Sequence, residues 1–123
     1  REKVEVFGTD YKTRDGSCIR DYVHVNDLAN AHLLALDFLK NEDQDLVVNL
    51  GTSRGMSVLE ILEIAKEVSE NKFQITIGPR RSGDPAIVLA KSDLASELLG
   101  WKPIHSDAQT LLSTMLRAYR MKF

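Results

Sequence analysis

The 123-residue sequence has a single cysteine, three prolines, seven glycines and no apolar run long enough to cross a membrane. One cysteine excludes an internal disulfide and fits a reducing cytosol, so we expect a cytoplasmic protein. A membrane span needs about 20 consecutive apolar residues, so no membrane association is expected. The sequence has 16 Lys and Arg against 18 Asp and Glu. Without a basic excess, nucleic acid is not expected as a partner.

Residues with the spacing of a catalytic or metal site are also lacking. The three histidines, His24, His32 and His105, are scattered, and none has metal-ligand spacing with Cys or carboxylate residues. Cys18 follows a turn and has no partner histidine nearby in the sequence, so a catalytic thiol is not expected. We therefore predict no catalytic residue and no metal ligand in this chain.

The remaining composition, 43% hydrophobic and 28% charged, is that of a globular protein. Alternating or short apolar runs predict strands over residues 4–7, 19–25, 46–50, 73–77 and 87–90. Helical periodicity predicts helices over residues 27–40, from 57, from 92 to Gly100, and from 106. We expect their N-caps to be Asn26, Ser57, Ser92 and Ser106, with capping boxes at Ser57/Glu60 and Ser106/Gln109. Trp101 is expected to pack under the last helix.

This pattern of four helices and four or five short strands predicts a mixed α/β fold. Strands this short are marginal alone, and the run 46–50 is typical of a strand buried on both faces. It therefore needs neighbours that this chain does not supply. The chain also opens in a strand pattern without an initiator Met. Together these features predict a piece of a longer protein.

The loop Arg80-Arg81-Ser82-Gly83-Asp84 is the first candidate binding motif. Arginine forms bidentate hydrogen bonds with phosphate oxygens, and a nearby carboxylate can accept from ribose hydroxyls. Glycine permits a close backbone approach or a positive φ. The loop therefore suits a nucleoside diphosphate, although an exposed turn with solvated charges has the same composition.

Two further motifs leave two interpretations open. In the segment 20–25, alternation places Arg20 on one face, where it could bind an anion or form an ion pair that only holds the strand. Residues 51–55 connect an apolar run to a helix N-terminus, a geometry that can bind phosphate. Their spacing matches neither phosphate-loop fingerprint, so a tight glycine connection is the preferred interpretation.

The sequence resembles the UDP-glucose 4-epimerases of the extended short-chain dehydrogenase/reductase superfamily. The resemblance lies in the runs VFGTDYKTRDGSCIRDYVHVNDLANAHLLAL, VVNLGTSRGMSVLEI, PRRSGDPA and ELLGWKP, which follow the family's order. It implies that the chain is the carboxyl-terminal part of an NAD-binding Rossmann-fold enzyme. Residues 1–25 and 53–123 would form most of a small mixed α+β substrate domain, and residues 26–52 would be a returning Rossmann helix and strand.

The resemblance also implies the residues that bind the UDP-sugar. Glu5, Val6 and Phe7 match the strand beside the uracil ring, and Arg20 and Arg81 match the arginines that contact the diphosphate. Asp84 matches the aspartate on the ribose, and Ser82 and Gly83 complete its loop. Val88 matches a position that selects between hexoses and N-acetylhexosamines, and a medium side chain there makes UDP-N-acetylglucosamine a second candidate substrate.

The implied reaction interconverts UDP-glucose and UDP-galactose through NAD-dependent oxidation at carbon 4, rotation of the keto sugar and re-reduction. The family's YxxxK and GxxGxxG motifs are missing from this sequence. We therefore expect the chain alone to be inactive, NAD to be held by a missing amino-terminal domain, and the full-length enzyme to be a homodimer. The alternatives are a nucleotide-sugar dehydratase or decarboxylase of the same superfamily, and a non-catalytic nucleotide-binding module. The chain departs from the family at Ser53, where glycine is common, and at Lys12, where proline is common.

Overall fold

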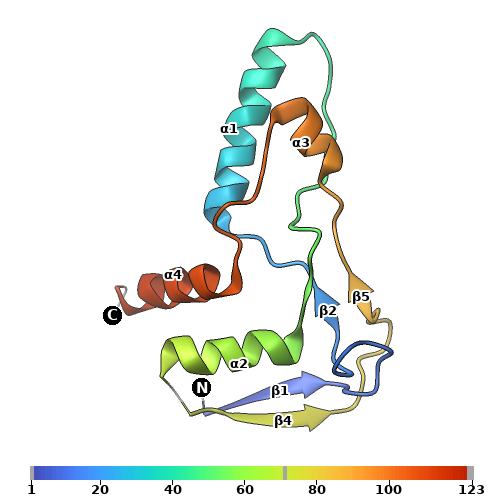
Figure 1. The fold of residues 1–123 in the computed structure, drawn as a ribbon, viewed down its shortest axis with the longest axis vertical. Helices are drawn as coiled ribbons and strands as arrows, with labels where there is room; N and C mark the ends of the chain where they lie inside the picture. Colours follow the sequence, from blue (N-terminus) through green and yellow to red (C-terminus); the bar gives the residue numbers. More distant parts are fainter. Residues whose placement is uncertain (1, 71, 122–123) are drawn as a thin grey trace.

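The computed structural model of the chain describes residues 2–70 and 72–121. The elements in chain order are β1 (Lys3–Phe7), β2 (Ile19–Arg20), α1 (Val25–Asn41), β3 (Met56–Ser57), α2 (Val58–Ser69), β4 (Gln74–Gly78), β5 (Ile87–Val88), α3 (Asp93–Leu99) and α4 (Ala108–Arg120). Figure 1 shows an elongated molecule, with α1 and α3 at one end and β1, β4, α2 and α4 at the other. The predicted mixed α/β architecture is confirmed. No helix in residues 2–70 and 72–121 is both long and apolar enough to span a bilayer.

Two small sheets position the candidate binding loops. Strands β1 and β4 are parallel, in a register that runs from Lys3 opposite Gln74 to Phe7 opposite Gly78. In the second sheet β2 lies between β3, which is antiparallel to it, and β5, which is parallel. The predicted strand at 19–25 is thus shorter than expected. It ends at Arg20, and the carboxylate of the next residue, Asp21, accepts from backbone amides of neighbouring loops.

The predicted strand at 46–50 is wrong for this chain. Residues 45–50 form no strand, and the side chain of Val47 is 89% exposed. An apolar segment becomes a strand only where another strand pairs with its backbone groups. Within the described residues, no strand lies beside this segment.

Helix α2 begins as predicted. The Ser57 hydroxyl accepts from the amide of Glu60 at 3.1 Å, and the Glu60 carboxylate accepts from the amide of Ser57 at 2.8 Å. This reciprocal capping box is confirmed. It satisfies two of the amides that the first turn of a helix leaves without a partner.

Three other predicted N-caps need correction. Helix α1 is capped by His24 instead of Asn26, because the imidazole Nδ1 accepts from the amide of Asn26 at 3.0 Å. Helix α4 is capped by Asp107, one residue after the predicted Ser106. Ser92 is at the N-cap of α3 but makes no capping bond, because its hydroxyl donates to the carbonyl of Gly51 at 2.9 Å. In each case a better-placed acceptor or a tertiary partner takes precedence over the local pattern.

The small apolar core between α1 and α3 is centred on Trp101. This side chain is 1% exposed and packs against Ala31 and Ala95. The prediction that Trp101 lies under the last helix is therefore wrong. Its indole NH donates to the carbonyl of Asp27 at 2.8 Å, which joins the loop after α3 to the first turn of α1.

The buried carboxylate of Asp27 holds the same loop from its other side. It accepts from the amides of Ile104 and His105 and from the hydroxyl of Ser106. Burial by itself raises the pKa of Asp27, but these hydrogen bonds outweigh burial and lower it below its ordinary value. The hydroxyl of Ser106 also accepts from the amide of His24 at 2.9 Å, so the three residues form one connected network.

We predict that Asp27→Ala lowers the free energy of unfolding by about 3 kcal/mol at neutral pH, because it leaves the partly buried amides of Ile104 and His105 and the hydroxyl of Ser106 without this acceptor. Since folding lowers the pKa of Asp27, its stabilisation is present above its unfolded-state pKa of about 3.9 and is lost as the pH falls through the folded-state pKa. The difference between wild type and variant should therefore shrink in acid. Denaturant unfolding at neutral and acidic pH measures it.

The matched control is Asp37→Ala, on the exposed face of the same helix. It should change stability by no more than about 0.5 kcal/mol. Equal losses from the two substitutions would contradict the role assigned to the Asp27 network.

Candidate functional site

The structure brings Arg20 and Asp84 into direct contact. The Arg20 guanidinium forms an ion pair with the Asp84 carboxylate and also donates to the carbonyl of Ile19 at 2.8 Å. Both side chains are partly buried, at 24% and 30% exposure. The sequence left open whether Arg20 binds an anion or forms an ion pair, and the ion pair is present. A guanidinium has more N–H donors than these two contacts use, so Arg20 retains donors for a ligand.

Arg81 and Phe7 form a second contact in the same region. The guanidinium carbon of Arg81 lies 3.8 Å from the centroid of the Phe7 ring. Arg81 is exposed and takes part in none of the ion pairs found among the described residues. The ring of Phe7 therefore contacts the Arg81 guanidinium without neutralising its charge. A cation in this position suits an anionic ligand.

The turn from Arg81 to Asp84 links the Arg81–Phe7 contact to the Arg20–Asp84 ion pair. The amide of Asp84 donates to the carbonyl of Arg81 at 3.3 Å, and Gly83 has a φ of 79°. The predicted positive φ of Gly83 is therefore confirmed. Ser82 and Gly83 are both exposed on this turn.

The other predicted site residues lie on neighbouring strands. Val88 is 47% exposed and lies opposite Arg20 in the parallel pairing of β2 with β5. On β1, Val6 is 2% exposed, so its side chain belongs to the core and only its backbone could meet a ligand. Glu5 is exposed, and its side chain lies over Gly78. A Cβ added to Gly78 would lie 2.4 Å from Oε1 of Glu5.

The carboxylate of Asp21 supports the site without belonging to it. It accepts from the amides of Thr52, Ser53 and Ala90 at 2.8, 3.1 and 3.2 Å. Burial raises the pKa of Asp21, but the hydrogen bonds from Thr52, Ala90 and Ser53 lower it overall.

These bonds explain the loop 51–55. A Cβ on Gly51 would lie 2.6 Å from both Asp21 and Ala90, and Ser53 adopts a φ of 57°, a conformation that glycine takes more readily. The preferred interpretation of a tight connection is confirmed. The loop is packed against the protein, so it is not a phosphate cradle.

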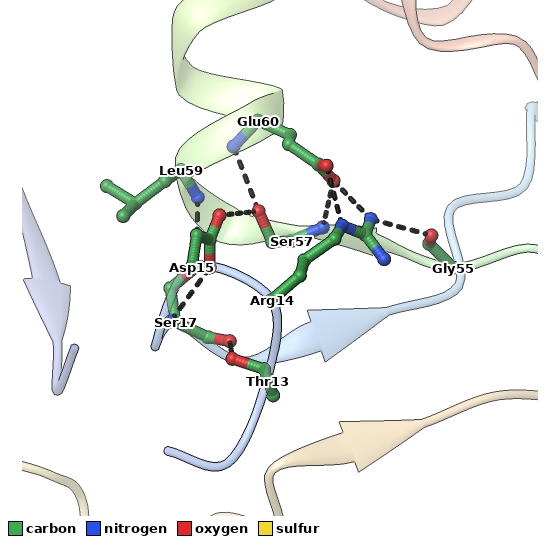
Figure 2. A network of polar contacts seen from close by, with 8 residues as sticks. All are labelled: Thr13, Arg14, Asp15, Ser17, Gly55, Ser57, Leu59 and Glu60. Carbon is green, nitrogen blue, oxygen red and sulfur yellow. Dashed lines mark hydrogen bonds and ion pairs between the residues drawn. The ribbon is translucent and has the colours of Figure 1, made fainter. Parts of the chain in front are cut away.

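A polar network holds the loop before β2 against the start of α2 (Figure 2). The Asp15 carboxylate accepts from the amide and hydroxyl of Ser17 and from the hydroxyl of Ser57. Arg14 adds an ion pair with Glu60 and donates to the carbonyl of Gly55. The loop that reaches from β1 to Arg20 is thus anchored at its far end.

Arg80 differs from Arg81 in its contacts, a difference that only the family resemblance, and not the residue types of the loop, indicated. It pairs with Asp10 at 2.7 Å, donates to the Asp10 carbonyl, and lies 4.1 Å from the centroid of the Tyr11 ring. The Arg80 hydrogen bond lowers the pKa of the Asp10 carboxyl below its usual value. Asp10, Tyr11 and Arg80 were missed as a group because their spacing in the sequence shows no pattern.

In the described part of the chain, no group of His, Cys, Asp and Glu side chains could hold a metal ion. The site consists of two arginines, an aromatic ring and a carboxylate around one loop: Arg20, Arg81, Phe7 and Asp84. These groups can bind an anionic ligand with a hydroxylated or aromatic portion.

Comparison with known proteins identifies relatives of the chain. Residues 1–51 match the NAD dependent epimerase/dehydratase family. UDP-glucose 4-epimerase of Halalkalibacterium halodurans is 48% identical over 112 residues, which are 91% of this chain and 34% of that protein. The chain thus spans about a third of the length of the curated relatives it matches.

Solved structures show the same relationship. A crystal structure of UDP-glucose 4-epimerase matches 99% of this chain with a TM-score of 0.95 and 42% identity, over 37% of its own chain. The enzyme of Bifidobacterium longum, solved in complex with NAD+ and UDP, matches 99% of this chain with a TM-score of 0.86 and 35% identity, over 36% of its own chain. The fold is therefore that of one part of these epimerases.

We predict that Gly83→Ala lowers the free energy of unfolding by about 1–2 kcal/mol, because an alanine at this positive φ is strained but a Cβ would have no atom within 4 Å. Gly16→Ala is the matched comparison. Gly16 also has a positive φ, of 82°, and its Cβ would lie 1.9 Å from the Thr9 carbonyl oxygen. It should cost clearly more in denaturant unfolding, and equal losses would show that Gly83 is constrained by more than its backbone.

Proposed function

We propose that this relative of UDP-glucose 4-epimerases is the carboxyl-terminal part of such an enzyme and binds its UDP-sugar. The observation that carries the proposal is the loop 81–84, which places an unpaired Arg81 on Phe7 and joins Asp84 to Arg20. The proposed contacts are Arg20 and Arg81 with the diphosphate and Asp84 with the ribose. Glu5, Val6 and Phe7 lie along the uracil, and Ser82 and Gly83 shape the turn.

The charges of these groups support the proposal. A diphosphate carries about two negative charges, and the two arginines supply matching positive charges in a bidentate geometry. Arg20 is held by Asp84 before a ligand arrives, so little side-chain entropy is lost when it binds. The strand β1 is paired on one side only within the described residues, so its backbone groups at Glu5–Phe7 are available to a flat polar ring.

Activity of the complete enzyme would require NAD, and the residues of this chain do not fit that cofactor. The sequence has no GxxGxxG loop, and in the glycine loop 51–55 the amides of Thr52 and Ser53 already donate to the Asp21 carboxylate. We therefore propose that NAD is held outside this chain. The proposed overall reaction is the interconversion of UDP-glucose and UDP-galactose.

The proposed domain division is the one that the family resemblance implies, and exposed apolar groups support it. Residues 26–52 would complete a Rossmann domain, and residues 1–25 and 53–123 would form most of the substrate domain. Support comes from α1 and the segment after it, whose apolar side chains include Leu33 at 68% and Val47 at 89% exposure. Buried apolar residues on both faces are typical of the strands of a parallel sheet.

The proposed selectivity of Val88 rests on its position. It is exposed beside Arg20, where it would lie near the sugar if Arg20 binds the diphosphate. A side chain of this size leaves space for an N-acetyl group, so UDP-N-acetylglucosamine remains a candidate substrate. A homodimer and a cytoplasmic location also remain predictions.

We predict that Arg81→Ala weakens UDP binding by about 1.5–3 kcal/mol, the size of a hydrogen bond to a charged group. Isothermal titration calorimetry on the protein at its natural length measures this. Lys102→Ala removes an exposed positive charge on the loop after α3 and is the matched control. An unchanged UDP affinity in Arg81→Ala would refute the assignment of Arg81.

We also predict that residues 1–123 alone do not interconvert UDP-glucose and UDP-galactose, even with added NAD, because the sequence contains no YxxxK motif. A coupled assay for UDP-glucose formation, run beside the protein at its natural length, tests this. Turnover by the isolated chain would show that it carries its own catalytic residues.

A further inference from the structure

The two adjacent arginines of the candidate loop occupy contrasting environments. Arg80 is held by three contacts: the Asp10 carboxylate, the Asp10 carbonyl and the Tyr11 ring. Arg81 contacts Phe7 and has no ion pair among the described residues. The charge of Arg80 is therefore neutralised, whereas the charge of the adjacent Arg81 is available.

Tyr11 is the aromatic partner of Arg80. Its side chain is 8% exposed, and its hydroxyl is buried without a well-formed hydrogen bond. Burial, the neighbouring Cys18 thiol and the charge of Asp84 raise the pKa of Tyr11. The ring thus covers one face of the Arg80 guanidinium, and the Cys18 thiol lies 4.0 Å from the Asp84 carboxylate at the other end of the loop.

Gly8 brings this ring and Arg80 together. Its φ is 87°, and a Cβ there would lie 2.7 Å from Cγ of Arg80 and 2.8 Å from Cε2 of Tyr11. The amide of Gly8 donates to the carbonyl of Gly78 at 3.0 Å, which extends the pairing of β1 with β4 up to the loop. Both stacked arginines therefore start from the same end of this sheet.

We infer that Arg80, Asp10 and Tyr11 form a clamp that positions the loop, so that Arg81 and Asp84 face the nucleotide. They are assigned as positioning residues because Asp10 neutralises the charge of Arg80 and the Tyr11 ring covers one face of its guanidinium. This inference rests on the proposed binding of UDP by Arg81. An exposed ion pair and an arginine on an aromatic ring each contribute little to the stability of a fold. The clamp therefore adjusts the loop geometry and does not determine the fold.

The sign of one substitution separates this role from simple electrostatics. If Arg80 attracts the diphosphate directly, Asp10 opposes binding, and Asp10→Ala should strengthen it by releasing Arg80 and removing a negative charge. If Arg80 acts as a clamp, Asp10→Ala should weaken UDP binding, by about fivefold at the upper value for an exposed ion pair. Asp10→Asn keeps an acceptor for Arg80 and should retain most of the affinity.

The experiment is calorimetric titration of UDP into the protein at its natural length, with thermal melts to show that each variant is folded. Asp10→Ala, Asp10→Asn, Arg80→Ala, Arg81→Ala and the double variant Arg80→Ala/Arg81→Ala form the set. Glu67→Ala, an exposed acidic residue on α2, is the charge-matched control. Arg80→Ala should weaken binding in the wild-type background and have little effect in the Arg81→Ala background, because the clamp acts through Arg81.

Tyr11 supplies a pair of variants that test the ring without changing a charge. Tyr11→Phe should keep UDP affinity, since the buried hydroxyl has no well-formed hydrogen bond, and Tyr11→Leu should weaken it several-fold by removing the aromatic face. Equal affinity in these two variants would overturn the role of the ring.

The outcomes distinguish the two levels of the proposal. If Arg81→Ala leaves UDP affinity unchanged, the proposed binding site is wrong and the clamp with it. If Arg81→Ala weakens binding while Asp10→Ala strengthens it or leaves it unchanged, the binding site stands and the clamp is overturned. The clamp is supported only if Asp10→Ala and Arg80→Ala both weaken binding and the Arg80 effect depends on Arg81.

Discussion

The hydrogen bonds accepted by the Asp21 carboxylate hold together the parts of the chain that carry the site. They join the residue after β2 to the loop 51–53 and to Ala90, just beyond β5. The strands themselves are only two residues long, so their ladders contribute few bonds. A partly buried carboxylate that accepts from several backbone amides replaces the missing ladder, because each amide needs an acceptor once it leaves water.

Two other carboxylates, those of Asp27 and Asp15, also hold loops by accepting hydrogen bonds. Asp27 holds the loop 104–106 against α1, and Asp15 holds the loop before β2 against α2. In all three cases the hydrogen bonds lower the pKa of the carboxyl below its ordinary value. The apolar core is small, and Trp101 is its largest fully buried side chain. The carboxylates therefore fix the geometry of loops that apolar packing alone leaves undetermined.

The arginines in and around the candidate site differ in whether a carboxylate neutralises their charge. Arg14, Arg20 and Arg80 each have a carboxylate partner, whereas Arg81 has only the face of Phe7 in the described part of the chain. A cation on an aromatic ring keeps most of its charge, so Arg81 is the group best suited to meet an incoming anion. The similarity to UDP-glucose 4-epimerases is consistent with this assignment of Arg81.

The sequence by itself determined the features that depend on neighbours along the chain. The helical period of α1 and the Ser57/Glu60 capping box appear as predicted, because each rests on contacts a few residues apart. The alternation at residues 4–7 also predicted its strand, although that strand forms by pairing with the distant β4. Motif order also identified the relatives. The tertiary structure alone decided which groups meet across long separations. It made His24 and Asp107 the caps, placed Trp101 between α1 and α3, left residues 46–50 without a strand, and paired Arg80 but not Arg81. The capping bonds of His24 and Asp107 are themselves local, but Ser106 is bonded to Asp27, Trp101 to Asp27 and Arg80 to Asp10, all tens of residues away. No local pattern encodes where such distant partners lie.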